Sequence, residues 1–330
     1  MARGELLKKL FLSYSKGDGT GFRDTALQII TDEERHNNRV LANALRRNLD
    51  FQSPGSSAQR RLEVIPFEKD KQLPLVEEVK PERRAGDIVL SRQNQQLLLS
   101  VLEEFRRNDL IRSHGLRVRS KLLFCGPPGC GKTLCAEVFA NEAHLPLLVA
   151  NMDTLVSSYL GETATNLRRV FEYAATRPVV LLLDEFDAIG RLRDDETQHG
   201  ELKRLVNSLL QLIDKYSGTG FIIAATNHEK QLDNAIWRRF DEIAYFSLPT
   251  KAEVARLLKL MFKNFRANFS VENKVDSLPG FSHAEIERVC LNAIRRSILR
   301  RREIVDERSF DQAVKFEVRR HRISEKLPQV

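Results

Sequence analysis

One loop of fixed spacing constrains the fold of this chain more than any other feature. The segment 126–133 reads Gly-Pro-Pro-Gly-Cys-Gly-Lys-Thr and fits the pattern Gly-x-x-x-x-Gly-Lys-Ser/Thr at every specified position. The apolar run 121–125 before it has the length of a strand, and residues 134–142 after it have a helical pattern. Such a loop between a strand and a helix is typical of proteins that bind nucleoside triphosphates, so we expect an α/β fold built around a nucleotide.

The residue types of this phosphate loop suit that task. Gly126, Gly129 and Gly131 allow backbone N–H groups to turn towards phosphate oxygens, and the following helix adds the dipole of its N-terminus. We expect Lys132 to reach the β- and γ-phosphates and Thr133 to bind Mg²⁺. The expected nucleotide site is completed by the other loop residues and the first residue after the loop, namely Pro127, Pro128, Cys130 and Leu134.

Composition favours a globular protein of the cytoplasm or the nucleus. The chain has 330 residues, of which 42% are hydrophobic, enough for one large domain with an appendage or for two domains. No run approaches the roughly 18 apolar residues of a membrane span, and residues 1–12 are too charged for a signal peptide. The four cysteines form no disulfide framework. The net charge is +8, but the basic residues are interspersed with acidic ones, so the charge only weakly indicates a nucleic-acid partner.

Three regions follow one another along the chain. Residues 1–75 are expected to form an N-terminal helical extension, with a glycine-rich turn at 16–21, followed by a linker. Residues 82–249 alternate strand-length apolar runs with amphipathic helices, which predicts a P-loop α/β domain whose parallel sheet is sandwiched by helices. Residues 250–330 contain only helical patterns and predict a small all-helical lid domain. Besides 121–125, the expected strands are 145–149, 179–183, 221–225 and 243–246.

The apolar run 179–183 ends abruptly in carboxylates. Asp184 is placed to hold Mg²⁺ together with Thr133, and Glu185 to orient or deprotonate the water that attacks the γ-phosphate. Asp187 is a candidate helix cap.

Two further segments carry polar groups. After the run 221–225, Asn227 could hydrogen-bond the attacking water or the γ-phosphate without adding negative charge, or it could form a turn. Arg238 and Arg239 are adjacent cations, and such a pair taken alone is more often engaged in surface salt bridges.

In this order, the phosphate loop, the Asp-Glu strand end, the strand-terminal Asn and the segment Ala-Ile-Trp-Arg-Arg-Phe-Asp resemble AAA+ ATPases over about residues 82–320. The resemblance is to the AAA branch, which includes katanin, spastin and the endosomal-sorting disassembly ATPases. It implies that Asn227 is the sensor of the γ-phosphate and that Arg238 and Arg239 are arginine fingers reaching the ATP of a neighbouring subunit. Catalysis would then require a ring of identical subunits, usually a hexamer.

The same resemblance assigns Asp87 and Ile88 to the adenine side of the site, and residues 280–286 to the nucleotide-sensing helix of the lid. Many family members have Ser-Gly-Ala where this chain has serine followed by His283 and Ala284. His283 either contacts the ribose or a phosphate or caps a helix, and both possibilities stay open at this stage.

The segment 157–163, Ser-Ser-Tyr-Leu-Gly-Glu-Thr, resembles the pore loop with which AAA rings grip unfolded polypeptide. Tyr159 and Leu160 would contact a client through apolar area, and an aromatic residue packed in the core is the alternative. We therefore expect ATP-driven protein remodelling, unfolding or disassembly by an oligomeric ring, with ATP and Mg²⁺ as cofactors and a polypeptide client, with or without an adaptor or a separate protease. An AAA+ ATPase of the loader or initiator type, acting on nucleic acid, is the alternative.

Cys130 lies beside Lys132 and near a helix N-terminus. Both influences favour the thiolate, so we expect Cys130 to have a lowered pKa if the thiol is accessible, and to be the reactive cysteine. An inert thiol shielded by the loop is the alternative.

Overall fold

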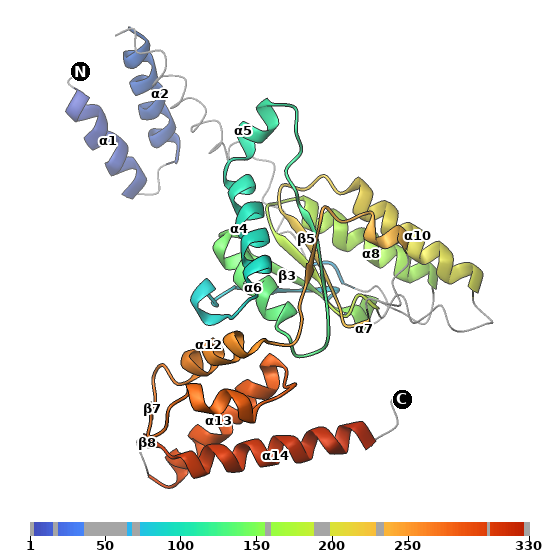
Figure 1. The fold of residues 1–330 in the computed structure, drawn as a ribbon. Coiled ribbons are helices and arrows are strands. Elements are labelled where there is room, and N and C mark those ends of the chain that lie inside the picture. The colour runs from blue at the N-terminus through green and yellow to red at the C-terminus, as the bar shows by residue number, and fades with distance from the viewer. Residues whose placement is uncertain are drawn as a thin grey trace. The chain divides into compact units, whose positions relative to one another are not determined.

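The computed structural model describes residues 3–15, 19–35, 65–67, 73–155, 160–187, 199–228, 234–301 and 304–326. The chain forms two compact units, Met1–Val64 and Ile65–Val330 (Figure 1). In the first unit, helices α1 (Arg3–Ser15) and α2 (Gly19–Arg35) contact each other. Of the turn expected at 16–21, residues 19–21 belong to α2 instead, and residues 16–18 lie outside the described residues.

A six-stranded sheet with the order β1-β3-β4-β5-β2-β6 forms the centre of the second unit. β1 pairs antiparallel with β3, and the other pairs are parallel, which confirms the predicted α/β fold with a mostly parallel sheet. The strands are β1 (Val76–Val79), β2 (Lys121–Cys125), β3 (Leu147–Ala150), β4 (Val180–Leu183), β5 (Phe221–Thr226) and β6 (Glu242–Tyr245).

β1 lies between the predicted N-terminal extension with its linker, which ends at residue 75, and the predicted α/β domain, which begins at residue 82. Its four residues are Val-Glu-Glu-Val, and only Val76 is fully buried. A short edge strand with charged residues at its centre carries almost no hydrophobic pattern. The edge strand was therefore missed.

Helices cover both faces of the sheet (Figure 1). On one face, α8 (Leu160–Ala175) and α10 (His199–Lys215) pack against Leu181 and Leu183 of β4. On the other, α4 (Arg92–Arg106) and α6 (Lys132–Glu142) pack against Val180 and Leu182. Since successive side chains of a strand point to opposite faces, a strand covered on both sides is apolar throughout. Shorter helices are η1 (Ala85–Asp87), α5 (Asn108–Ser113), α7 (Met152–Leu155) and α11 (Asn234–Trp237).

The C-terminal part has a hydrophobic core of its own, in which Leu258, Ile286 and Phe310 are fully buried. It consists mainly of α12 (Lys251–Met261), η4 (Glu272–Ser277), α13 (His283–Leu299) and α14 (Glu307–Lys326). Two short strands, β7 (Arg266–Ala267) and β8 (Ile304–Val305), pair in parallel, so the expectation of helices alone was wrong there. Strands of two residues are too short to leave a periodic pattern. The predicted boundaries at residues 75, 82 and 249 stay predictions.

Among the described helices, none combines the length and the apolar character needed to cross a membrane.

Candidate active site

The phosphate loop leaves β2 and enters α6, and its first glycine lies against the end of β6. Gly126 has a φ of 137°. A Cβ at this position would lie 2.1 Å from the carbonyl oxygen of Phe246. The close approach is fixed by the backbone N–H of Phe246, which donates to the carbonyl oxygen of Cys125 at 2.7 Å. Only glycine combines this conformation with this contact.

Lys132 lies inside the loop. Its Nζ donates to the carbonyl oxygens of Gly126 at 2.7 Å and Pro127 at 2.9 Å, and the residue is 6% exposed. The ammonium is thus held next to the N-terminus of α6, where its charge and the helix dipole attract the same anion.

The two residues expected to bind Mg²⁺ touch each other. The Thr133 hydroxyl donates to Oδ2 of Asp184 at 2.7 Å, although the two residues are 51 positions apart in the sequence. Octahedral Mg²⁺ holds oxygen ligands at about 2.1 Å, so neighbouring ligand oxygens are about 3 Å apart. A hydroxyl and a carboxylate at this separation fit the coordination of that ion.

Glu185 is exposed and has a φ of 49°, in the left-handed region that non-glycine residues rarely adopt. Its backbone N–H donates to Oδ1 of Asp184 at 2.9 Å, and that of Phe186 donates to the carbonyl oxygen of Ala225 at 2.9 Å. Such a conformation costs on the order of 1–3 kcal/mol and persists where the surroundings enforce it, often at active sites. The turn therefore presents the Glu185 carboxylate in a constrained position.

Asn227 lies, like Glu185, just beyond the carboxyl end of a strand. It follows β5, which runs parallel to β4 on one side and to β2 on the other. The carboxyl ends of these three strands therefore bring Asn227 together with Glu185 and the phosphate loop. The sequence pattern missed one participant at this end of the strands: Thr226, the last residue of β5, is fully buried and donates its hydroxyl to Asp187 at 3.1 Å.

Arg238 and Arg239 lie at the other end of the parallel strands, near the amino end of β2. Two residues further on, the Asp241 carboxylate accepts from the backbone N–H of Lys121 at 2.9 Å, at the first residue of β2. The phosphate loop follows the last residue of this strand, about 13 Å away at the usual rise per residue. Arg239 donates through Nε to Asp214 at 2.9 Å, and Arg238 is exposed.

The lid contacts the phosphate loop through the first turn of α13. The backbone N–H of Ala284 donates to the carbonyl oxygen of Gly129 at 2.9 Å. Ser282 is the N-cap of α13, with its hydroxyl accepting from the N–H of Glu285 at 3.4 Å. His283 is therefore not the cap, which removes one of the two possibilities left open for it.

Two properties of His283 suit it to contact a ligand. Burial lowers its pKa, so the imidazole is held in its neutral form. Nδ1 is buried and has no hydrogen-bond partner within the part of the chain that the structure describes. A buried polar atom of this kind ordinarily has a partner.

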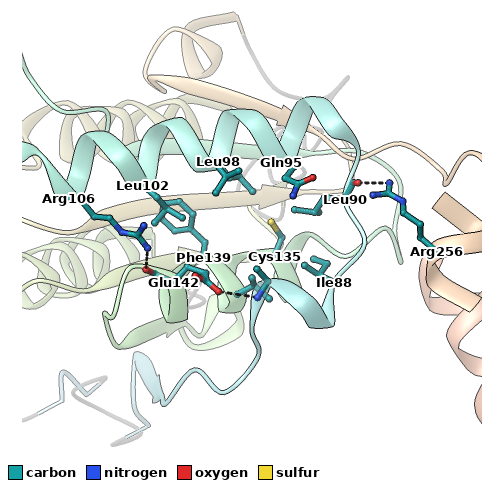
Figure 2. A pocket seen from close by; sticks show the side chains of 13 residues that line it. Ile88, Leu90, Gln95, Leu98, Leu102, Arg106, Cys135, Phe139, Glu142 and Arg256 are labelled. Atoms are coloured by element: carbon teal, nitrogen blue, oxygen red, sulfur yellow. Dashed lines mark hydrogen bonds between the residues drawn. The ribbon is translucent and has the colours of Figure 1, made fainter. Parts of the chain in front are cut away.

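In the segment predicted to lie on the adenine side, the Asp87 carboxylate accepts from the backbone N–H of Arg84 at 2.9 Å and so closes its own turn. The next residue, Ile88, lines a pocket of about 180 Å³ between α4 and α6 (Figure 2). Its walls are mainly apolar, including Leu98, with the Cys135 sulfur pointing inward and charged residues only towards the ends. Leu134 on α6 is half-buried.

Tyr159 of the predicted client site lies outside the described residues. Leu160 is the first residue of α8, and its side chain is likewise outside the description.

The predicted thiolate at Cys130 is wrong. The residue is 3% exposed, and burial raises its pKa, although the nearby Lys132 acts in the opposite direction. The sequence argument weighed the charge and the helix end but could not weigh the loss of water around the sulfur, which is the larger effect here.

Comparison with known proteins agrees with this geometry. Residues 122–248 match the family model of the ATPase family associated with various cellular activities (AAA). An uncharacterized AAA family ATPase of Sinorhizobium fredii, y4kL, is 53% identical over 322 residues, which cover 97% of each chain.

Two archaeal relatives named after the proteasome also match. The proteasome-activating nucleotidase of Thermococcus onnurineus is 32% identical over 264 residues, covering 77% of this chain and 66% of that protein. A putative 26S proteasome regulatory subunit homolog of Methanothermobacter marburgensis is 28% identical over 314 residues, covering 93% and 82%. The more specific resemblance to katanin and spastin stays a prediction. With the phosphate loop, the paired Thr133 and Asp184, and similarity along nearly its whole length, the chain belongs to the AAA family of ATPases.

Proposed function

We propose that this ATPase works as a hexameric ring that remodels, unfolds or disassembles proteins by threading polypeptide through a central pore. ATP hydrolysis with Mg²⁺ is the activity of the family. The ring and the threading are the proposal, and the position of Arg238 and Arg239 is the observation that carries it.

These arginines lie at the amino end of β2, whereas the phosphate loop lies at its carboxyl end. The separation of about 13 Å along the strand exceeds what an arginine side chain bridges. Arg238 and Arg239 would therefore stabilise the charge on the phosphoryl group of a neighbouring subunit, in addition to Lys132 of that subunit. Subunits that each donate arginines at one end of the sheet and bind ATP at the other would make a head-to-tail contact, the kind of contact from which closed rings are built.

Within each site, we assign the roles to this chain's residues as follows. Lys132 binds the β- and γ-phosphates, and Thr133 with Asp184 holds Mg²⁺, which neutralises the developing negative charge. Glu185 accepts a proton from the attacking water, and Asn227 orients this water against the γ-phosphate.

The lid and the adenine side complete the proposed site. Nδ1 of His283 would hydrogen-bond the ribose or a phosphate, which satisfies a buried atom that has no protein partner among the described residues. Asp87 orders the turn before Ile88, whose apolar side chain would pack against the base.

A polypeptide client is supported by the names of the archaeal relatives, which refer to the proteasome, a protein-degrading assembly. Tyr159 and Leu160 would grip the client in the pore. An aromatic side chain suits this task because it contributes apolar area without requiring a particular sequence.

The test has two readouts. In the presence of ATP, the Glu185→Gln variant should form a hexamer by mass photometry, because it retains the nucleotide. Unfolded casein should stimulate the wild-type ATPase, Tyr159→Ala should lose this stimulation and keep the basal rate, and Tyr159→Phe should retain both. Full activity of a demonstrated monomer would contradict the ring. Stimulation by DNA in place of casein would favour the nucleic-acid alternative.

A further inference from the structure

A hydrogen-bond network joins the turn that carries Glu185 to the end of β5. Oδ1 of Asp187 accepts from the Thr226 hydroxyl at 3.1 Å and from the backbone N–H of Asn227 at 3.3 Å. The Thr226 hydroxyl in turn accepts from the backbone N–H of His228 at 3.0 Å. Nε2 of His228 lies 3.9 Å from the other carboxylate oxygen of Asp187.

The direction of each bond in this network is determined. A hydroxyl has one proton, and a backbone N–H can only donate. The Thr226 hydroxyl therefore accepts from His228 and gives its proton to the Asp187 carboxylate. A valine side chain of the same shape could serve neither neighbour.

The network lies at the carboxyl ends of β4 and β5. The last residues paired between these two strands are Leu183 and Ala224, and β5 stays paired with β2 as far as Thr226. Glu185 and Asn227 therefore both lie beyond the last paired residues of their strands. Asp187 and Thr226 are both fully buried. Hydrogen bonds shielded from water, with a carboxylate as acceptor, are stronger than exposed ones.

We propose that Asp187 and Thr226 are positioning residues that hold Glu185 and Asn227 in a fixed relative position. The inference rests on the catalytic roles proposed above for those two residues. Asp187 and Thr226 act through Glu185 and Asn227. The hydrogen bonds made by Asp187 and Thr226, which we call the clamp, extend the alignment of β4 and β5 to Glu185 and Asn227, so that both side chains face the same water molecule. Misplacing a catalytic group by about 1 Å lowers a rate by about a hundredfold.

Thr226→Val removes the hydroxyl and keeps the shape of the side chain. We expect kcat for ATP hydrolysis to fall about 10- to 100-fold, while the Kd for ATP changes by less than about twofold, because the phosphate loop is not part of the clamp. Thr226→Ser should recover most of the rate. Thr176→Val is the matched control: this exposed hydroxyl donates to the carbonyl oxygen of Tyr173 at 2.7 Å, remote from the site, and its loss should leave kcat unchanged.

Two substitutions of the carboxylate separate hydrogen bonding from burial. Asp187→Asn keeps an oxygen acceptor and should reduce kcat less than Asp187→Leu, which removes it. If Thr226→Val fails to fold, this pair still decides the question. Equal kcat values for both folded variants and the wild type would overturn the clamp.

A double-mutant cycle tests whether the clamp acts through the sensor. In an Asn227→Ala background, Thr226→Val should slow hydrolysis by less than about threefold, because residues acting as a unit are not additive. Fully multiplicative effects would overturn the proposal. If Asn227→Ala and Glu185→Gln each leave kcat unchanged, the proposed catalytic roles fail. If both slow hydrolysis and Thr226→Val does not, only the clamp fails.

Discussion

The backbone N–H of Ala284 donates to the carbonyl oxygen of Gly129 at 2.9 Å, which joins the first turn of α13 to the middle of the phosphate loop. The contact depends on the absence of a side chain at Gly129. A Cβ there would lie 2.9 Å from the hydroxyl oxygen of Ser282 and 3.2 Å from the Cβ of Ala284. The lid helix and the loop therefore fit together only as long as position 129 is glycine.

Gly129→Ala should weaken ATP binding at least about tenfold, because the lid helix must move away from the loop. Gly115→Ala is a matched control: Gly129 and Gly115 have φ values of 73° and 74°, but a Cβ at Gly115 would meet nothing within 4 Å. Both changes should lower the free energy of unfolding by about 1–2 kcal/mol through backbone strain. Only the first should change the Kd for ATP in titration calorimetry, and equal ATP affinities would contradict the lid contact.

Lys132→Ala and Glu185→Gln should separate binding from hydrolysis. The first removes the cation that holds the phosphates and should abolish nucleotide binding. The second removes the proton acceptor and should bind ATP while hydrolysing it at least about a hundredfold more slowly. Calorimetric titration with ATP and a phosphate-release assay distinguish them. The assigned roles are untenable if the two variants bind ATP equally well.

The central part of the fold was predictable because its signals are local and strong. β2, predicted at 121–125, has these bounds in the structure, since a buried strand next to a glycine loop combines an apolar run with a clear stop. β5 extends only one residue beyond the predicted run, to Thr226. β1 and the pair β7 and β8 were not predictable, because β1 has charged residues at its centre and β7 and β8 have two residues each, so none carries an apolar pattern.

At the site, the sequence identified residue types and the structure added their neighbours. Thr133 and Asp184 were expected to share an ion, and they lie in contact. The role of Thr226 depends on its hydrogen bond to Asp187, which follows the neighbouring strand β4 and is 39 positions away in the sequence. No spacing along the chain indicates this contact. The pKa of Cys130 depends on how much water the folded loop leaves around the sulfur, and only the three-dimensional packing determines this.

Arg238→Ala and Arg239→Ala subunits should bind ATP nearly normally and fail to hydrolyse it, because in the proposed ring each arginine completes the site of a neighbour. Arg239 also pairs with Asp214 at 2.9 Å, where the side chains are 35% and 46% exposed, so a small loss of stability is expected from this substitution. ATP affinity, ATPase rate and melting temperature are the measurements.

Mixing provides the decisive control for the arginines. Arg239→Ala subunits have intact phosphate loops, and Lys132→Ala subunits have intact arginines. Mixed rings contain some interfaces with both, so turnover should reappear on mixing two inactive proteins, and activity should depend on protein concentration. Arginines that act within their own subunit would give no recovery.

Cys130 should react slowly with iodoacetamide at neutral pH. Burial raises the pKa of its thiol, so less thiolate is present at pH 7.5 than for a free cysteine, whose pKa is about 8.5. Because the thiolate is the nucleophile, alkylation should accelerate as the pH rises towards this raised pKa. Burial raises the pKa of Cys290 to about 12, so Cys290 should react later still. Peptide mapping by mass spectrometry across pH 7 to about 9.5 measures both rates, with Cys130→Ala as the control that removes the faster signal. Rapid modification of Cys130 at pH 7 would contradict the effect of burial and restore the reactive thiolate.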